Sequence, residues 1–208
     1  MEMEKRRETY NKILEIRDQG KIFEYITTNL AQEELHQLYQ GPFTEKTLLH
    51  IVCEDKTDNS TKALVYLLKQ GLDPDGKTKG CNAVPPILRA AQFNHKNIEI
   101  LLVAGANIFA IHENRLNALT VAMNTENYES VNILARNGLS VSLPISLSWG
   151  YHFKQEIVDY AQKREETYRT CRNKVIILLG IKRRRPPSLV LFDKYLIREV
   201  GFAIWSMR

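Results

Sequence analysis

One short pattern occurs three times in this chain, and its period of about 33 residues constrains the fold more than any other feature. Each copy begins with a short run of apolar and small residues. A second run follows, with apolar residues three or four positions apart, and the copy closes with a glycine. The closing glycines, Gly71, Gly105 and Gly138, lie 34 and 33 residues apart. Because a spacing of three or four residues is typical of one helix face, the pattern predicts a series of stacked helical pairs.

Special residues stand where such pairs would need them. Ala90, Ala91 and Ala122 would let two helices approach closely, and Pro85-Pro86 suits the first turn of a helix, where a missing N–H leaves no gap in the hydrogen-bond ladder. The three closing glycines suit the left-handed residue that often ends a helix, since glycine adopts that conformation at low cost. These residues strengthen the prediction of paired helices.

The three copies resemble ankyrin repeats. The T-P-L-H-x-A-A, G-H and L-L-x-x-G-A-D signatures of that family are found in altered form as Thr47-Leu48-Leu49-His50, Asn94-His95 and Leu101-Leu102-Val103-Ala104-Gly105-Ala106-Asn107. The resemblance implies an all-α fold, an ankyrin-repeat solenoid of helix-turn-helix units with helical N- and C-terminal caps. We expect an N-terminal helical cap over 1–40, three degenerate repeats over 41–145, an atypical terminal repeat and basic linker over 146–185, and a C-terminal helix over 186–208.

The resemblance also implies a site. Ankyrin stacks commonly bind proteins on a concave face formed by the turn tips and the exposed side of each first helix. In register with that pattern, the expected partner-binding residues are Lys46, Glu54, Asp55, Asn82, Val84, Gln92, Phe93, Asn114, Leu116, Asn124 and Thr125. Phe93 is the first choice, because aromatic anchors dominate many interfaces. The alternative is that a neighbouring loop covers it.

Charge and composition exclude several other classes of protein. The longest apolar run, Val175 to Ile181, is far shorter than the roughly 20 residues that cross a bilayer. The three cysteines show no CxxC spacing, which argues for reduced thiols and against a zinc site. The N-terminus shows no secretory pattern. We therefore expect a cytoplasmic monomer that needs no metal and no cofactor.

Other candidate motifs are better explained as structure. In the ankyrin pattern a histidine at the place of His50 bonds backbone in the turn, and His95 matches the corresponding loop histidine. Cys81 with His95 or His112 could form a thiol-enzyme triad, but no family signature surrounds it. Asp73 to Lys77 lacks the further ligands of a calcium loop and predicts a β-turn.

A P-loop string also occurs by sequence. Gly71 to Thr78 satisfies G-x4-G-K-T, yet a P-loop needs a preceding strand and a following helix. Here a helix is expected before the string, and Pro85-Pro86 comes soon after it. We therefore do not expect nucleotide binding.

The C-terminal quarter is basic. From position 150 onward there are 13 Lys and Arg against 6 Asp and Glu, so the overall charge of +5 comes from this part. The run Lys182, Arg183, Arg184 and Arg185 allows three interpretations: a solvated linker, a nuclear-import signal, or a contact to nucleic acid or an anionic membrane. Nucleic acid is disfavoured because no aromatic residues or nucleic-acid motif accompany the run.

Three functions stay open. The apolar run, the basic run and the final helix resemble the tail of ankyrin-type effectors of intracellular bacteria, which implies a non-catalytic effector that binds a host protein in the cytosol or nucleus. A second possibility is an adaptor whose C-terminal helix recruits a ubiquitin ligase or another complex. The third is an enzyme with a cryptic site in 146–181, where Tyr151, His152, Glu156 and Asp159 would be the candidate residues.

Overall fold

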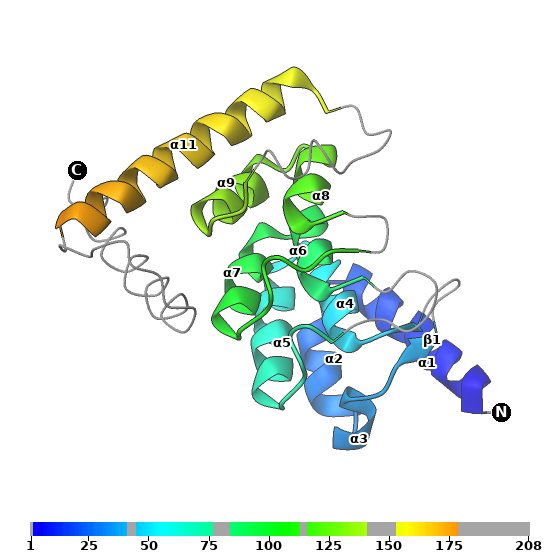
Figure 1. Cartoon of the computed structure of the whole chain (residues 1–208). Helices are drawn as coiled ribbons and strands as arrows, with labels where there is room; N and C mark the ends of the chain where they lie inside the picture. The colour runs from blue at the N-terminus through cyan, green and yellow to red at the C-terminus, as the bar shows by residue number, and fades with distance from the viewer. Residues whose placement is uncertain (1, 41–44, 77–83, 113–115, 141–152, 179–208) are drawn as a thin grey trace.

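The computed structural model describes residues 2–40, 45–76, 84–112, 116–140 and 153–178, and in these ranges the chain is predominantly helical (Figure 1). The helices are α1 (Glu2–Asp18), α2 (Ile22–Asn29), α3 (Gln32–Leu35), α4 (Leu48–Cys53), α5 (Asp58–Lys69), α6 (Pro86–Phe93), α7 (His95–Val103), α8 (Ala118–Asn124), α9 (Tyr128–Arg136) and α11 (Gln155–Leu178). Two short strands, β1 (Tyr39–Gln40) and β2 (Glu45–Lys46), pair antiparallel with Tyr39 opposite Lys46. The predicted all-α class is confirmed.

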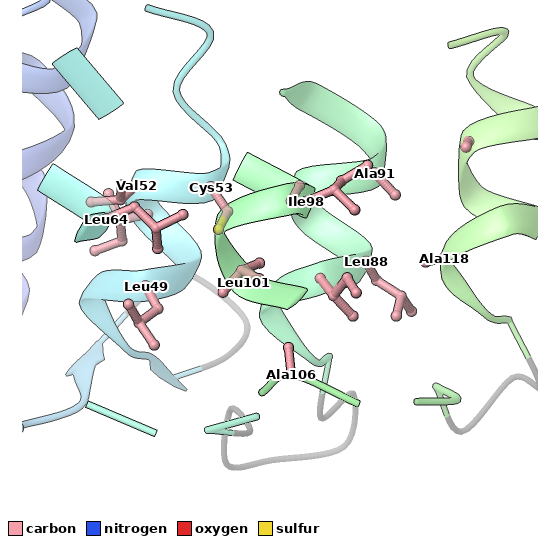
Figure 2. Close-up of a cluster of buried hydrophobic side chains, with 14 of the residues drawn as sticks. Leu49, Val52, Cys53, Leu64, Leu88, Ala91, Ile98, Leu101, Ala106 and Ala118 are labelled. Carbon is pink, nitrogen blue, oxygen red and sulfur yellow. The ribbon is translucent and has the colours of Figure 1, made fainter. Parts of the chain in front are cut away.

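The six helices between residues 48 and 136 form three pairs that stack on one another. The first helices α4, α6 and α8 contact one another in that order, and so do the second helices α5, α7 and α9 (Figure 1). Each first helix also packs on its own second helix. Leu49, Val52, Leu64, Leu88 and Leu101 from four of these helices meet in the core between the two layers (Figure 2).

The small and special residues have the roles that their positions predict. Ala90, Ala91 and Ala122 are fully buried, so first helices can lie close together. Pro86 is the first residue of α6, and Pro85 is its N-cap. Each closing glycine follows a second helix with a positive φ, as at Gly105 (φ 95°). Nothing lies within 4 Å of the position where a Cβ would stand at Gly105, so it is the backbone conformation that requires glycine there.

Buried polar side chains connect one pair to the next. Asn94 donates from Nδ2 to the Asp55 carbonyl (2.9 Å) and to Ser60 Oγ (3.0 Å), and its Oδ1 accepts from the Lys96 amide at the start of α7. Its one side chain thus caps a helix and joins two pairs, in a buried place where an unbonded polar group would be costly.

His50 makes a similar connection. Its Nδ1 lies 2.7 Å from Thr47 Oγ1, and its Nε2 bonds the carbonyl of Val84 at the start of the next pair. The predicted structural role of His50 is therefore confirmed. His95 is half-buried and begins α7.

Helices α1, α2 and α3 precede the pairs, where the sequence predicts two or three helices. α2 packs against α5, while α1 contacts α2 and β1. Ile13, Ile22 and Ile26 are fully buried at these contacts and continue the core toward the N-terminus.

The end of the described chain differs from the form of a repeat. A terminal repeat with an enlarged middle would have one helix around Ile157 to Ala161 and another around Val175 to Gly180, but α11 runs without a break from Gln155 to Leu178. The physical reason is that residues 162–174 hold neither glycine nor proline and include Gln, Lys, Arg and Glu, which favour helix. α11 lies along α9 at the end of the stack (Figure 1).

Several sequence expectations concern the loop after α5 and the C-terminal part of the chain. Asp73 to Gly76 forms the predicted turn, closed by the Gly76 amide on the Asp73 carbonyl (2.9 Å), and it follows helix α5 where a P-loop would require a strand. Lys77, Thr78 and Cys81 lie outside the described residues, as do Lys182, Arg183, Arg184 and Arg185 and the expected helix 186–208. Within the described ranges no helix is long and apolar enough to cross a membrane.

Candidate interaction surface

Equivalent positions of α6 and α8 supply side chains that the core leaves uncovered, whereas every residue of α4 is buried and only Glu54, just after it, is partly uncovered. In α6 these side chains are Arg89, Gln92 and Phe93, and at the end of α8 they are Val121, Asn124 and the C-cap residue Thr125. The spacing of three and four residues puts each set on one helix face. The residue two positions before each first helix adds Lys46, Val84 and Leu116. We call the uncovered set the first-helix surface; it consists of Lys46, Glu54, Val84, Arg89, Gln92, Phe93, Leu116, Val121, Asn124 and Thr125.

An open hollow of about 200 Å³ lies between α6 and α8 on this surface. Its lining holds polar uncharged and apolar side chains and no charged one: Gln92, Leu116, Thr120, Val121, Asn124 and Thr125. Four of these six residues, Gln92, Leu116, Asn124 and Thr125, are among the predicted partner-binding residues. The structure therefore brings residues from the second and third copies together around one depression.

A charged cluster adjoins the hollow on the α4 side. The Glu54 carboxylate is 2.7 Å from Lys46 Nζ, 3.4 Å from Arg17 Nη1 and 3.5 Å from Arg89 Nε. These three cations come from β2, α1 and α6, and the Glu54 side chain is only 10% exposed. Lys46 and Glu54 are thus held by internal ion pairs, and Arg17 also pairs with the exposed Asp18 (2.8 Å).

Asp55 does not belong to the surface, which corrects the sequence prediction. It is 4% exposed, and its carboxylate accepts hydrogen bonds from the Thr57 amide (2.8 Å) and hydroxyl (2.9 Å). An aspartate that bonds the backbone two residues later forms a local turn, which here leads into α5. The pattern Asp-x-Thr before a helix is the sequence signal that could have indicated this role.

The remaining predicted residues differ in their placement. Phe93 is half-buried and does not line the hollow. Val84 is half-buried and packs against the core. Asn82 and Asn114 lie outside the described residues, so the structure does not place them.

Arg89 is the main residue that the sequence prediction missed. Its Nη1 donates to Gln92 Oε1 at 3.5 Å, which links the charged cluster to the hollow. A signal was present in the sequence, since Arg89 is the one charged residue in the otherwise apolar and small string Pro85 to Ala91. The contribution of Arg17 had no such signal, because 37 residues separate it from Glu54.

Of the four residues proposed for a cryptic enzyme site, the structure describes Glu156 and Asp159. Glu156 and Asp159 are both exposed on α11, and Asp159 accepts a hydrogen bond from Gln155. Tyr151 and His152 fall outside the described residues. Among the side chains that the structure describes, no group of three or more His, Cys, Asp or Glu could hold a metal ion.

The comparisons with known proteins add no relative. No model of a known protein family matches the chain, and no curated protein matches its sequence.

Proposed function

We propose that this chain is an ankyrin-repeat protein that binds a protein partner, without catalysis, through the first-helix surface. The fold assignment is supported by the stacked helical pairs, by their period of about 33 residues, and by the positive-φ glycine after each second helix. His50, which bonds the backbone at the start of the next pair, gives further support.

The observation that carries the functional proposal is the continuity of the uncovered side chains. Lys46, Glu54 and Arg89 are joined by ion pairs, Arg89 bonds Gln92, and Gln92 lines the hollow that extends onto α8. A surface that crosses three successive pairs suits an extended or helical segment of another protein.

The size of the hollow favours a protein partner over a small molecule. Sites for small molecules usually enclose roughly 300 to 1,000 Å³ and bury most of the ligand. The hollow here measures about 200 Å³ and is open to solvent. It fits one or two side chains of a partner.

Affinity capture with a matched pair of variants tests the proposal. Asn124→Arg places a long cation at the rim of the hollow, and Gln162→Arg adds the same charge at an exposed position of α11. Both variants and the unchanged chain would be used to capture proteins from eukaryotic cell lysate, with quantitative mass spectrometry as the readout. We expect a set of proteins that the unchanged chain and Gln162→Arg enrich equally and Asn124→Arg does not. Equal capture by all three chains would contradict binding at this surface.

A further inference from the structure

Arg89 is held in place on α6 with its hydrogen-bonding capacity largely unused. Its side chain is 28% exposed, and its buried Nε has no hydrogen-bond acceptor among the described residues. Its two polar contacts, to Glu54 and to Gln92, are both 3.5 Å long, whereas a strong bond of this kind is roughly 2.7 to 2.9 Å. Because Nε is buried and faces Glu54, a partner would meet Arg89 through the terminal nitrogens of its guanidinium, where Nη1 has the long contact to Gln92.

Glu54 neutralises Arg89 only in part, because two other cations share its carboxylate. Its Oε1 lies 2.7 Å from Lys46 Nζ, and its Oε2 accepts from Arg17 at 3.4 Å. The cluster contains three cations, Arg17, Lys46 and Arg89, against the two carboxylates of Glu54 and Asp18. It therefore carries one positive charge in excess, and Arg89 is the cation with the longest contacts.

We propose that the partner places an acidic side chain on Arg89 and that the residues next to this side chain occupy the hollow between α6 and α8. The inference rests on the proposed function and specifies the chemistry of the partner. A carboxylate matches the planar guanidinium, which can donate two parallel hydrogen bonds to it. One carboxylate also matches the single excess charge, whereas a phosphate would bring nearly two negative charges beside Glu54.

The hollow determines what lies beside the acidic residue. It begins at Gln92, which bonds Arg89, and its lining contains no charged side chain. Leu116 and Val121 provide apolar contact, while Thr120, Asn124 and Thr125 provide short polar groups. The partner segment thus presents an acidic residue followed or preceded by small polar or apolar residues.

Selection from a displayed library of short random peptides tests the inference on the full chain. Peptides that also bind the Asn124→Arg variant are removed, so that the peptides kept depend on the first-helix surface. We expect the kept peptides to share an Asp or Glu at one aligned position. Their affinity should fall roughly 10- to 100-fold with Arg89→Gln, the loss expected for a charge-assisted hydrogen bond.

Arg136→Gln is the matched control. Arg136 is 31% exposed and paired with Glu99, but both residues are on the second helices, so affinity should not change. A peptide whose acidic residue is replaced by its amide separates recognition from folding. That peptide should bind the unchanged chain as weakly as the parent peptide binds Arg89→Gln, and the two changes together should cause little further loss.

Two results would overturn the inference. If the kept peptides share no acidic position, or bind Arg89→Gln as tightly as the unchanged chain, the acidic chemistry is wrong while binding at the first-helix surface stands. If no peptide distinguishes the unchanged chain from Asn124→Arg, the proposed function fails together with the inference.

Discussion

Burial of His50 makes the stability of this chain depend on pH. The side chain is fully buried, and burial lowers its pKa to about 4 from an ordinary value of about 6.5. The bond to the Val84 carbonyl opposes this effect, and the nearby Arg89 adds to it. Between pH 6.5 and pH 4 the unfolded chain therefore binds a proton that the folded chain excludes, and the folded state loses stability as the pH falls through this range.

We predict that His50 alone accounts for about 3 kcal/mol of lost stability between about pH 7 and about pH 4. The loss is measured by urea unfolding of the unchanged chain and of His50→Gln at both pH values, since the variant lacks the titrating imidazole. The free energy of unfolding of the unchanged chain should fall by about 3 kcal/mol more than that of the variant. His36→Gln, at an exposed position after α3, is the control and should retain the full pH dependence. If the free energy of unfolding of His50→Gln falls between the two pH values by as much as that of the unchanged chain, His50 is not the source of the pH dependence.

Single residues also show how far the sequence could predict the site. Gly105 and His50 could be assigned because their roles depend on local backbone geometry, which a repeating pattern reveals. Asp55 was misassigned because register alone does not show that an aspartate can bond Thr57 in its own loop. Arg89 was missed because its importance comes from Arg17 and Lys46, which the fold brings to Glu54 from distant elements.

At the scale of elements, α11 acts as a cover for the last helical pair. Ile157, Val158 and Ala161 lie on one face of the helix and are buried, while α9 is the helix it contacts most. Tyr160, between Val158 and Ala161, packs edge-on against Tyr128 of α9, with 5.0 Å between the ring centroids. α11 therefore buries surface that a further repeat would otherwise cover.

We predict that Ala161→Arg destabilises the chain by about 2 to 3 kcal/mol, because the fully buried position has no room for a longer side chain. Gln162→Arg, at the next and exposed position, should change stability by less than about 0.5 kcal/mol. Chemical unfolding followed by circular dichroism would compare the two. Equal stability of both variants would mean that α11 contributes little to the stack.

The length of α11 could not be obtained from the repeat pattern. The resemblance of Ile157 to Ala161 and Val175 to Gly180 to a repeat with an enlarged middle predicts two helices with a turn between them. Local helix propensity decides otherwise, because the residues from Gln162 to Lys174 include no residue that would end the helix. The register of a repeat predicts the helices inside the repeats accurately. It is less accurate beyond them, where the sequence no longer follows the period.

On the scale of the whole molecule, the described helices contact mainly their neighbours along the stack. α2 packs on α5, the three pairs follow one another, and α11 closes the series on α9. In such an arrangement stability is approximately the sum of local and nearest-neighbour contributions, so one end can open while the other stays folded.

We predict that a cavity near one end loosens that end selectively. Leu134 on α9 and Leu67 on α5 are both fully buried, and replacing either with alanine should cost roughly 2 to 5 kcal/mol. In hydrogen exchange followed by mass spectrometry, Leu134→Ala should speed exchange in α8, α9 and α11 more than in α2 and α5. Leu67→Ala should speed exchange in α2, α4 and α5 more than in α9 and α11. Each variant therefore serves as the control for the other.

If the exchange rate increased uniformly along the chain in both variants, the prediction would be contradicted and the helices would unfold as one unit. The result bears on binding, because the first-helix surface crosses from α4 to α8. A partner that contacts both the Arg89 cluster and the hollow would connect pairs that otherwise open separately. It should therefore slow exchange in α6 and α8 together, and it should do so most in Leu134→Ala, where the last pair opens most often.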